Sequence, residues 1–230
     1  MITQEQMSQF ARFCEERFDL HTIAKHTFQS LPICIIECIY SLRANYTSTT
    51  NVVQRYADKC MGGDISSNAD TISNFITQID NNYGGPQGSA GNLFESQAKF
   101  GHGITPKHNA SNLTLKSEVC YNLARKFQEH NINNITDFRS ANPDDIERYM
   151  REVKWVGDAA VNYLFMLAGD PTRVKPDVHI HHCVRDCFGY DLSNQDIQVL
   201  FTDTVHELQS CYSTLTVRNL DSVIWNYYHR

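Results

Sequence analysis

The chain has 230 residues, 41% of them hydrophobic and 20% charged, which suits one large domain or two small lobes with a buried core. A formal net charge of −6 argues against broad non-specific binding of nucleic acid, but leaves a local binding face open. The sequence has neither a run of about 18 apolar residues nor a signal-peptide pattern at its start. We therefore expect a cytoplasmic protein without a membrane partner, associated with the nucleoid if it is bacterial.

The amino-terminal half is predicted to be helical, because apolar residues recur there at helical spacing. Such stripes cover residues 10–18, 34–42, 52–57 and 72–79. Residues 81–91 are rich in glycine and asparagine, and this composition predicts a loop. A second irregular stretch is expected over 101–112.

The carboxy-terminal half is also predicted to be helical, and no alternating strand pattern interrupts it. A helix restarts over 115–127. Asn142, Pro143 and Asp144 supply the cap, first-turn proline and early acid that open another helix. Further helices are expected over about 158–168, 177–188, 193–209 and 217–228. The whole pattern favours an all-α fold.

Eight cysteines are scattered through half-apolar segments, and without a secretion signal we expect reduced thiols that serve as small core residues. His179, Cys183 and Cys187 fall at i, i+4 and i+8, with His182 adjacent, so one helical face presents ligands that zinc accepts. No further Cys/His pair nearby completes a tetrahedral site. The sequence therefore favours a buried stripe over a metal site.

A tight turn followed by a helix start is predicted around Gly157. Glycine lets the backbone approach another surface closely, and the free N–H groups and positive dipole end of a helix start bind phosphate without net charge. The predicted DNA-backbone contacts are Lys154, Trp155, Val156, Gly157 and Ala159. The alternative is a plain connection between two helices, with Trp155 in the core.

The segment Asp177-Val178-His179-Ile180 begins 18 residues after Ala159. Together with the turn, with residues 34–46 and with the closing stretch 220–225, it gives a layout that resembles the helix-hairpin-helix DNA glycosylases, the HhH-GPD superfamily with endonuclease III-like members. Two departures stand out. Trp155 occupies the place of the first hairpin glycine, and Ala159 that of the lysine of bifunctional members.

The resemblance implies an all-α fold with two helical lobes around a DNA-binding cleft. One lobe would comprise about 1–25 and 110–230, and the other about 26–109, within a single domain. It also implies a monomer that binds double-stranded DNA containing a damaged or modified base. No cofactor is expected, because only Cys211 follows Cys187 and the four-cysteine iron–sulfur pattern is missing; a monovalent or divalent ion at the hairpin remains compatible.

The resemblance implies that Asp177 is the catalytic carboxylate, which stabilises a positively charged, oxocarbenium-like sugar as the base leaves. Because Ala159 cannot form a Schiff base, water is the expected nucleophile and an abasic site the product. Arg43, Asn45 and Tyr46 are candidates for the base pocket or for the wedge that fills the gap left by a flipped base. The alternative is that Arg43 and Asn45 are the basic residue and the cap at the C-terminus of a helix.

Three functional hypotheses remain open at this stage. The first is a monofunctional DNA glycosylase; the second is a non-catalytic DNA-binding module in which Asp177 is only a helix cap. The third is a metal-assisted enzyme that uses the His/Cys face. The sequence does not identify the base, so damaged purines, mismatched pyrimidines and modified phage cytosines stay open, as do roles in repair and in defence.

Overall fold

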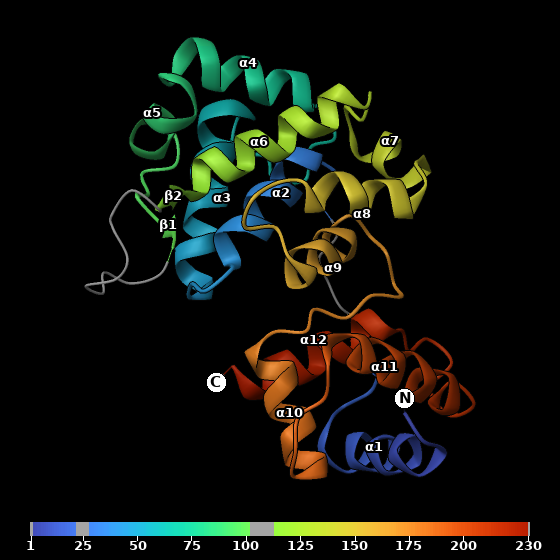
Figure 1. Ribbon diagram of the computed structural model, residues 1–230. Helices are drawn as coiled ribbons and strands as arrows, with labels where there is room; N and C mark the ends of the chain where they lie inside the picture. The colour runs from blue at the N-terminus through green and yellow to red at the C-terminus, as the bar shows by residue number, and fades with distance from the viewer. Residues whose placement is uncertain (1, 22–27, 102–112, 230) are drawn as a thin grey trace. The chain divides into compact units, whose positions relative to one another are not determined.

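The computed structural model describes residues 2–21, 28–101 and 113–229, and the predicted irregular stretch over 101–112 lies almost entirely outside them. Within these residues the protein is mostly helical, as predicted (Figure 1). The helices are α1 Gln4–Arg17, α2 Leu31–Ser41, α3 Tyr46–Cys60, α4 Ile72–Asn82, α5 Gly85–Asn92, α6 Lys116–Glu129, α7 Ile135–Ser140, α8 Pro143–Arg151, α9 Asp158–Leu167, α10 Val178–Phe188, α11 Asn194–Leu208 and α12 Val217–Tyr228.

The described strands are a single short antiparallel pair, which the sequence pattern did not predict. Strand β1 (Lys99–Phe100) pairs with β2 (Thr114–Leu115), with Lys99 opposite Leu115 and Phe100 opposite Thr114. Two residues a strand are too few to produce an alternating pattern. None of the helices that the structure describes is long and apolar enough to cross a bilayer.

The chain divides into two compact units, 28–164 on the one hand and 1–27 with 165–230 on the other. The terminal segments share one unit. The second boundary falls at 164/165, whereas the expectation placed it near 110. The reason is α6: its buried side chains, which include Val119, Leu123 and Phe127, pack it against α2, α4 and α5 in the unit 28–164.

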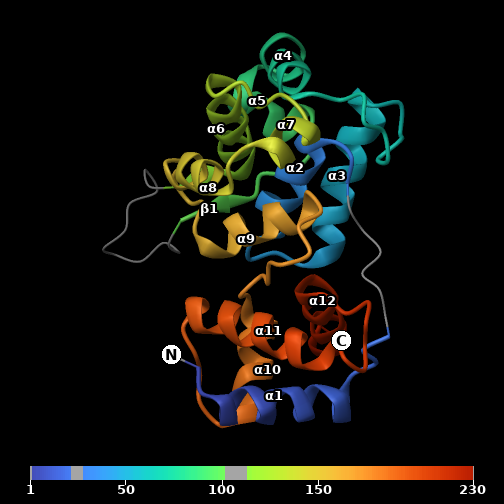
Figure 2. The ribbon, with the colours of Figure 1, turned by 90° about the vertical axis from the view of Figure 1, so that its right-hand side faces the viewer.

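Helix α2 is the centre of the unit 28–164. Every residue from Leu31 to Tyr40 is buried, and α3, α4 and α6 pack against it (Figure 2). A helix that is hydrophobic on all sides is stable only where other elements surround it. The hydroxyl of Ser30 caps its start by accepting from the amide of Ile33, and Pro32 lies in its first turn. The turn after α2 therefore projects from a rigid core.

The predicted loop over 81–91 is wrong, because α5 occupies most of it. Gly84 takes φ of +76° just before the helix, and Pro86 lies in its first turn. A Cβ on Gly88 would come within 2.6 Å of the carbonyl oxygen of Tyr83. Small residues let α5 pack closely on α4 and α6, so tertiary packing overrides the poor helix propensity of glycine.

The second unit consists of α1, α10, α11 and α12, whose apolar faces meet in one core (Figure 1). Phe10 from α1 and Phe201 from α11 have ring centroids 5.4 Å apart in its centre. All eight cysteines are reduced thiols, as expected; Cys14 and Cys183 are buried in this core, whereas Cys211 is exposed. The unit therefore joins both ends of the described chain through apolar packing.

Candidate functional site

The segment between α8 and α9 is a tight turn. The amide of Val156 donates to the carbonyl of Val153 at 3.1 Å. Trp155, at the third position of this turn, takes φ of +74°. This left-handed conformation is the one that favours glycine at the same position of a type II turn. Trp155 thus adopts a backbone conformation that glycine usually takes at this position of a turn.

The indole of Trp155 packs against the β1–β2 pair. Its Nε1 donates to Thr114 Oγ1 at 2.9 Å, and its ring stacks on Phe100 with centroids 5.8 Å apart and planes 17° apart. The ammonium of Lys154 lies 5.2 Å from the centroid of the indole ring. These contacts offset the backbone strain and hold the side chain half-buried.

We expect Trp155→Gly to lower the free energy of unfolding by about 2 kcal/mol. Glycine removes a left-handed strain of about 1 kcal/mol, but loses about 3 kcal/mol of apolar packing and hydrogen bonding. Trp155→Phe, the matched control, keeps an aromatic ring for Phe100 and should lose less. Urea unfolding measures both variants; a Trp155→Gly protein more stable than the wild type would show that backbone strain outweighs the packing of the indole.

The start of α9 presents backbone amides and one exposed glycine. The first described intrahelical bond runs from the amide of Val161 to the carbonyl of Gly157 at 3.0 Å, so the amides of 158–160 precede it. A Cβ on Gly157 would meet no atom within 4 Å. Arg151 pairs with the carboxylate of Asp158 at 2.6 Å, which partly neutralises the one acid here.

The five predicted hairpin residues differ in exposure. Lys154 and Gly157 are exposed, whereas Trp155 and Ala159 are half-buried. Val156 is 6% exposed and belongs to the core. The side chain of Val156 is therefore shielded from any ligand, whereas the other four residues keep some exposed surface.

Asp177 is the N-cap of α10. Its Oδ1 accepts from the amides of His179 at 2.9 Å and Ile180 at 3.3 Å. Its Oδ2 lies 3.8 Å from the ammonium of Lys175, and the side chain is 18% exposed. The carboxylate is therefore held in one orientation, yet it is still accessible from solvent.

A second carboxylate, Asp221 on α12, lies close to this group and was not singled out from the sequence. It is buried, and its Oδ1 accepts from the backbone amide of Lys175 at 2.9 Å. Burial, with a smaller contribution from the charge of Asp177, raises the pKa of Asp221 to about 7, although the Lys175 amide and the charges of Lys175 and Arg218 act in the opposite direction. One signal was present: an acid on the apolar side of the closing helix.

Aromatic and imidazole rings lie next to the two carboxylates. Trp225, one turn after Asp221, stacks on His229 with centroids 4.0 Å apart. His179 meets the indole of Trp225 edge-on at 6.0 Å. His179 is thus packed among rings, while Cys183, one turn later, lies in the core, where burial raises the pKa of its thiol. In the part of the chain that the structure describes, no three His, Cys, Asp or Glu side chains are grouped to hold a metal ion.

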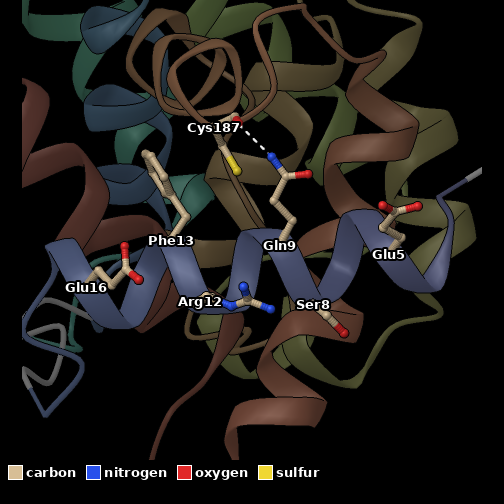
Figure 3. A pocket seen from close by; sticks show the side chains of 7 residues that line it. All are labelled: Glu5, Ser8, Gln9, Arg12, Phe13, Glu16 and Cys187. Atoms are coloured by element: carbon tan, nitrogen blue, oxygen red, sulfur yellow. Dashed lines mark hydrogen bonds between the residues drawn. The ribbon is translucent and has the colours of Figure 1, made fainter.

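Cys187 lines a shallow pocket of about 450 Å³ along α1, together with Glu5, Ser8, Gln9, Arg12, Phe13 and Glu16 (Figure 3). The side-chain amide of Gln9 donates to the carbonyl of Cys187 at 2.9 Å. Burial raises the pKa of the Cys187 thiol to about 11, so the thiol stays protonated at neutral pH. Because the thiolate is the nucleophilic form, this pocket is not equipped for cysteine chemistry.

Arg43, Asn45 and Tyr46, the predicted pocket or wedge residues, are all exposed; Arg43 and Asn45 lie in the turn between α2 and α3, and Tyr46 begins α3. Arg43 takes φ of +53°. Asn45 caps the start of α3 by accepting from the amide of Ser48 at 2.8 Å, whereas the alternative interpretation made it a cap at the end of the preceding helix, where Leu42 is the cap instead. Tyr46 is 45% exposed.

Glu37 is a buried carboxylate below this turn, and sequence reasoning missed it as well. It is 4% exposed on α2, and Tyr163 Oη on α9 donates to it at 3.2 Å. Burial and the charge of Glu37 raise the pKa of both Tyr163 and Tyr46. It is the one charged residue of α2, and a lone acid in an apolar helix is the signal that could have found it.

Nearly the whole chain matches one protein family. The profile of a family described as a domain of unknown function, DUF8548, matches residues 8–229. The chain belongs to this family. No curated protein matches the chain.

Proposed function

We propose that the protein is a monofunctional DNA glycosylase that acts on a damaged or modified base. The observation that carries this proposal is the Asp177 carboxylate, which two backbone amides orient and which remains 18% exposed. A fixed anion that is accessible to a ligand is what stabilisation of a positively charged sugar requires.

The proposed reaction is hydrolysis of the N-glycosidic bond. The base leaves with the bonding electron pair, the sugar becomes oxocarbenium-like, and water adds to its anomeric carbon. Asp177 stabilises the positive charge and accepts or orients the proton of the water. Ala159 offers no amine for a covalent imine, so the product is an abasic site and the strand stays intact. This chemistry needs no cofactor.

The turn between α8 and α9 is the proposed grip on the DNA backbone. Its support is local: the left-handed Trp155 makes a glycine-like turn, and Gly157 exposes backbone next to the first amides of α9. Phosphate binding by amides suits a chain of net charge −6. The proposal further assigns the exposed turn of Arg43, Asn45 and Tyr46 to the space vacated by the flipped base.

A non-catalytic DNA-binding module is the second candidate. The two hydrogen bonds that Asp177 accepts from backbone amides favour it, because they are the bonds of a helix cap and a cap needs no catalytic role. The two proposals differ in one readout, the release of a base.

Incubation of the protein with duplex oligonucleotides that carry different modified bases, followed by mass spectrometry of released bases, tests the proposal. We expect release of at least one base without strand cleavage, and no adduct when borohydride is added. Release accompanied by efficient borohydride trapping would contradict the monofunctional mechanism and point to an amine such as Lys154 or Lys175. Binding of every duplex without release from any would favour the non-catalytic module.

A further inference from the structure

The segment 171–177, between α9 and α10, is held by side chains and backbone of the last two helices. The side-chain amide of Gln198 on α11 holds the segment twice. Its Nε2 donates to the backbone carbonyl of Thr172 at 2.8 Å, and its Oε1 accepts from the backbone amide of Val174 at 3.1 Å. The amide of Arg218 on α12 donates to the carbonyl of Pro171 at 3.1 Å. An irregular segment that is tied in this way keeps one conformation.

Lys175 is the point at which this segment joins the two carboxylates. Its backbone amide donates to Asp221 at 2.9 Å, and its backbone carbonyl accepts from the amide of Asp177 at 2.7 Å. The second bond spans a single residue, the buried Pro176, so this turn is compact and has little freedom. A shift of the Lys175 backbone therefore moves Asp177 with it.

We propose that Asp221 is a positioning residue, which sets the place of the Asp177 carboxylate by holding the backbone of Lys175. This inference rests on the proposed glycosylase function, in which Asp177 acts on the sugar. Asp221 itself is buried. Its contribution passes through the peptide unit that connects the two acids.

The charge of Asp221 adds a pH dependence to this arrangement. A carboxylate accepts a backbone hydrogen bond more strongly than a neutral acid does. Burial and Asp177 raise the pKa of Asp221 to about 7, against the opposing Lys175 and Arg218, so the strong acceptor forms as pH rises through neutrality. Base release should therefore increase with pH across this range.

Two substitutions at Asp221 separate its roles. Asp221→Ala removes both the acceptor and the charge, whereas Asp221→Asn keeps an oxygen that accepts from Lys175 but carries no charge. Gln198→Ala, the matched control, loosens the same segment at Thr172 and Val174 without changing any charge. Single-turnover base release is measured per folded molecule across pH 5 to 9, on a duplex whose base the wild type releases, together with the Kd for that duplex.

At about pH 8 we expect Asp221→Ala to release base at least tenfold more slowly, with a Kd within about twofold of the wild type. Asp221→Asn should recover to within about threefold of the wild type, since a neutral acceptor makes a weaker bond, and its profile should lack the rise near neutral pH. Gln198→Ala should retain that rise. Unchanged release by Asp221→Ala, or a neutral-pH rise that persists in Asp221→Asn, would overturn the proposal.

Hydrogen exchange gives a second readout that does not depend on catalysis. The amides of His179 and Ile180 donate to Asp177, so displacement of Asp177 should make them exchange several-fold faster in Asp221→Ala and not in Asp221→Asn. If the wild type releases no base, the glycosylase proposal fails on that result alone. Faster exchange in Asp221→Ala would then still support positioning of Asp177, and unchanged exchange would refute it.

Discussion

Asp177→Asn should reduce base release by about 10²-fold or more while the protein still folds and binds DNA. The reason is the sign of the charge: the sugar becomes positive in the transition state, and an amide cannot supply the negative charge that stabilises it. Asparagine is as good a helix cap as aspartate and can still accept from His179 and Ile180. The weak pairing with Lys175 at 3.8 Å contributes little to stability.

Three measurements on Asp177→Asn decide between catalysis and capping: base release, DNA affinity and thermal unfolding. Asp203→Asn is the matched control, because Asp203 is exposed on α11 and has no proposed role; its release rate should equal that of the wild type. If Asp177→Asn melts at a much lower temperature but keeps the wild-type rate per folded molecule, Asp177 is a structural cap and the proposed mechanism is wrong.

A second large effect is expected on stability, because Asp221 should make the wild type less stable as pH rises from about 4 to 7. In the unfolded chain its carboxyl loses its proton near the ordinary value of 3.8, whereas in the folded protein burial raises its pKa to about 7. The folded state thus binds more protons than the unfolded state in this window, and the free energy of unfolding falls with pH. The pKa difference corresponds to ~4 kcal/mol, lost in full above about pH 7.

Asp221→Asn has no proton to lose and should not show this decline. Its free energy of unfolding, minus that of the wild type, should increase by ~4 kcal/mol between about pH 4 and about pH 8 when both are measured by urea unfolding. Subtracting the wild-type value cancels the effect of all other titrating groups. The same subtraction for Asp203→Asn should give a difference that does not change with pH. A constant difference across this range would mean that Asp221 is ionised in the folded protein throughout.

The positions of most helices could be predicted from sequence, because local chemistry decides them. The expected helices over 158–168 and 217–228 correspond to α9 and α12 within a residue, since their apolar spacing and their polar starts act within one or two turns. Helix α5 could not be predicted in this way. Its glycines oppose a helix locally, and only close packing on α4 and α6 makes one favourable.

In the candidate site, too, the local features could be predicted and the long-range ones could not. The cap role of Asp177 was recognisable because a cap and the helix that it opens are adjacent in the chain. Asp221 was not, because its partner Lys175 is 46 residues away and its raised pKa comes from burial, which no local pattern encodes. Trp155 is a similar case, since Phe100 and Thr114 hold it from distant positions.

By itself, the sequence determined the helical character, the caps and the spacing between turn and aspartate, since each depends on backbone periodicity and on hydrogen bonds between near neighbours. Only the tertiary structure decided that the chain divides at 164/165, that Trp155 takes a glycine-like conformation, and that Asp221 binds the backbone of Lys175 next to Asp177. These features depend on contacts between side chains that are far apart in the sequence, and such contacts exist only once the chain has packed.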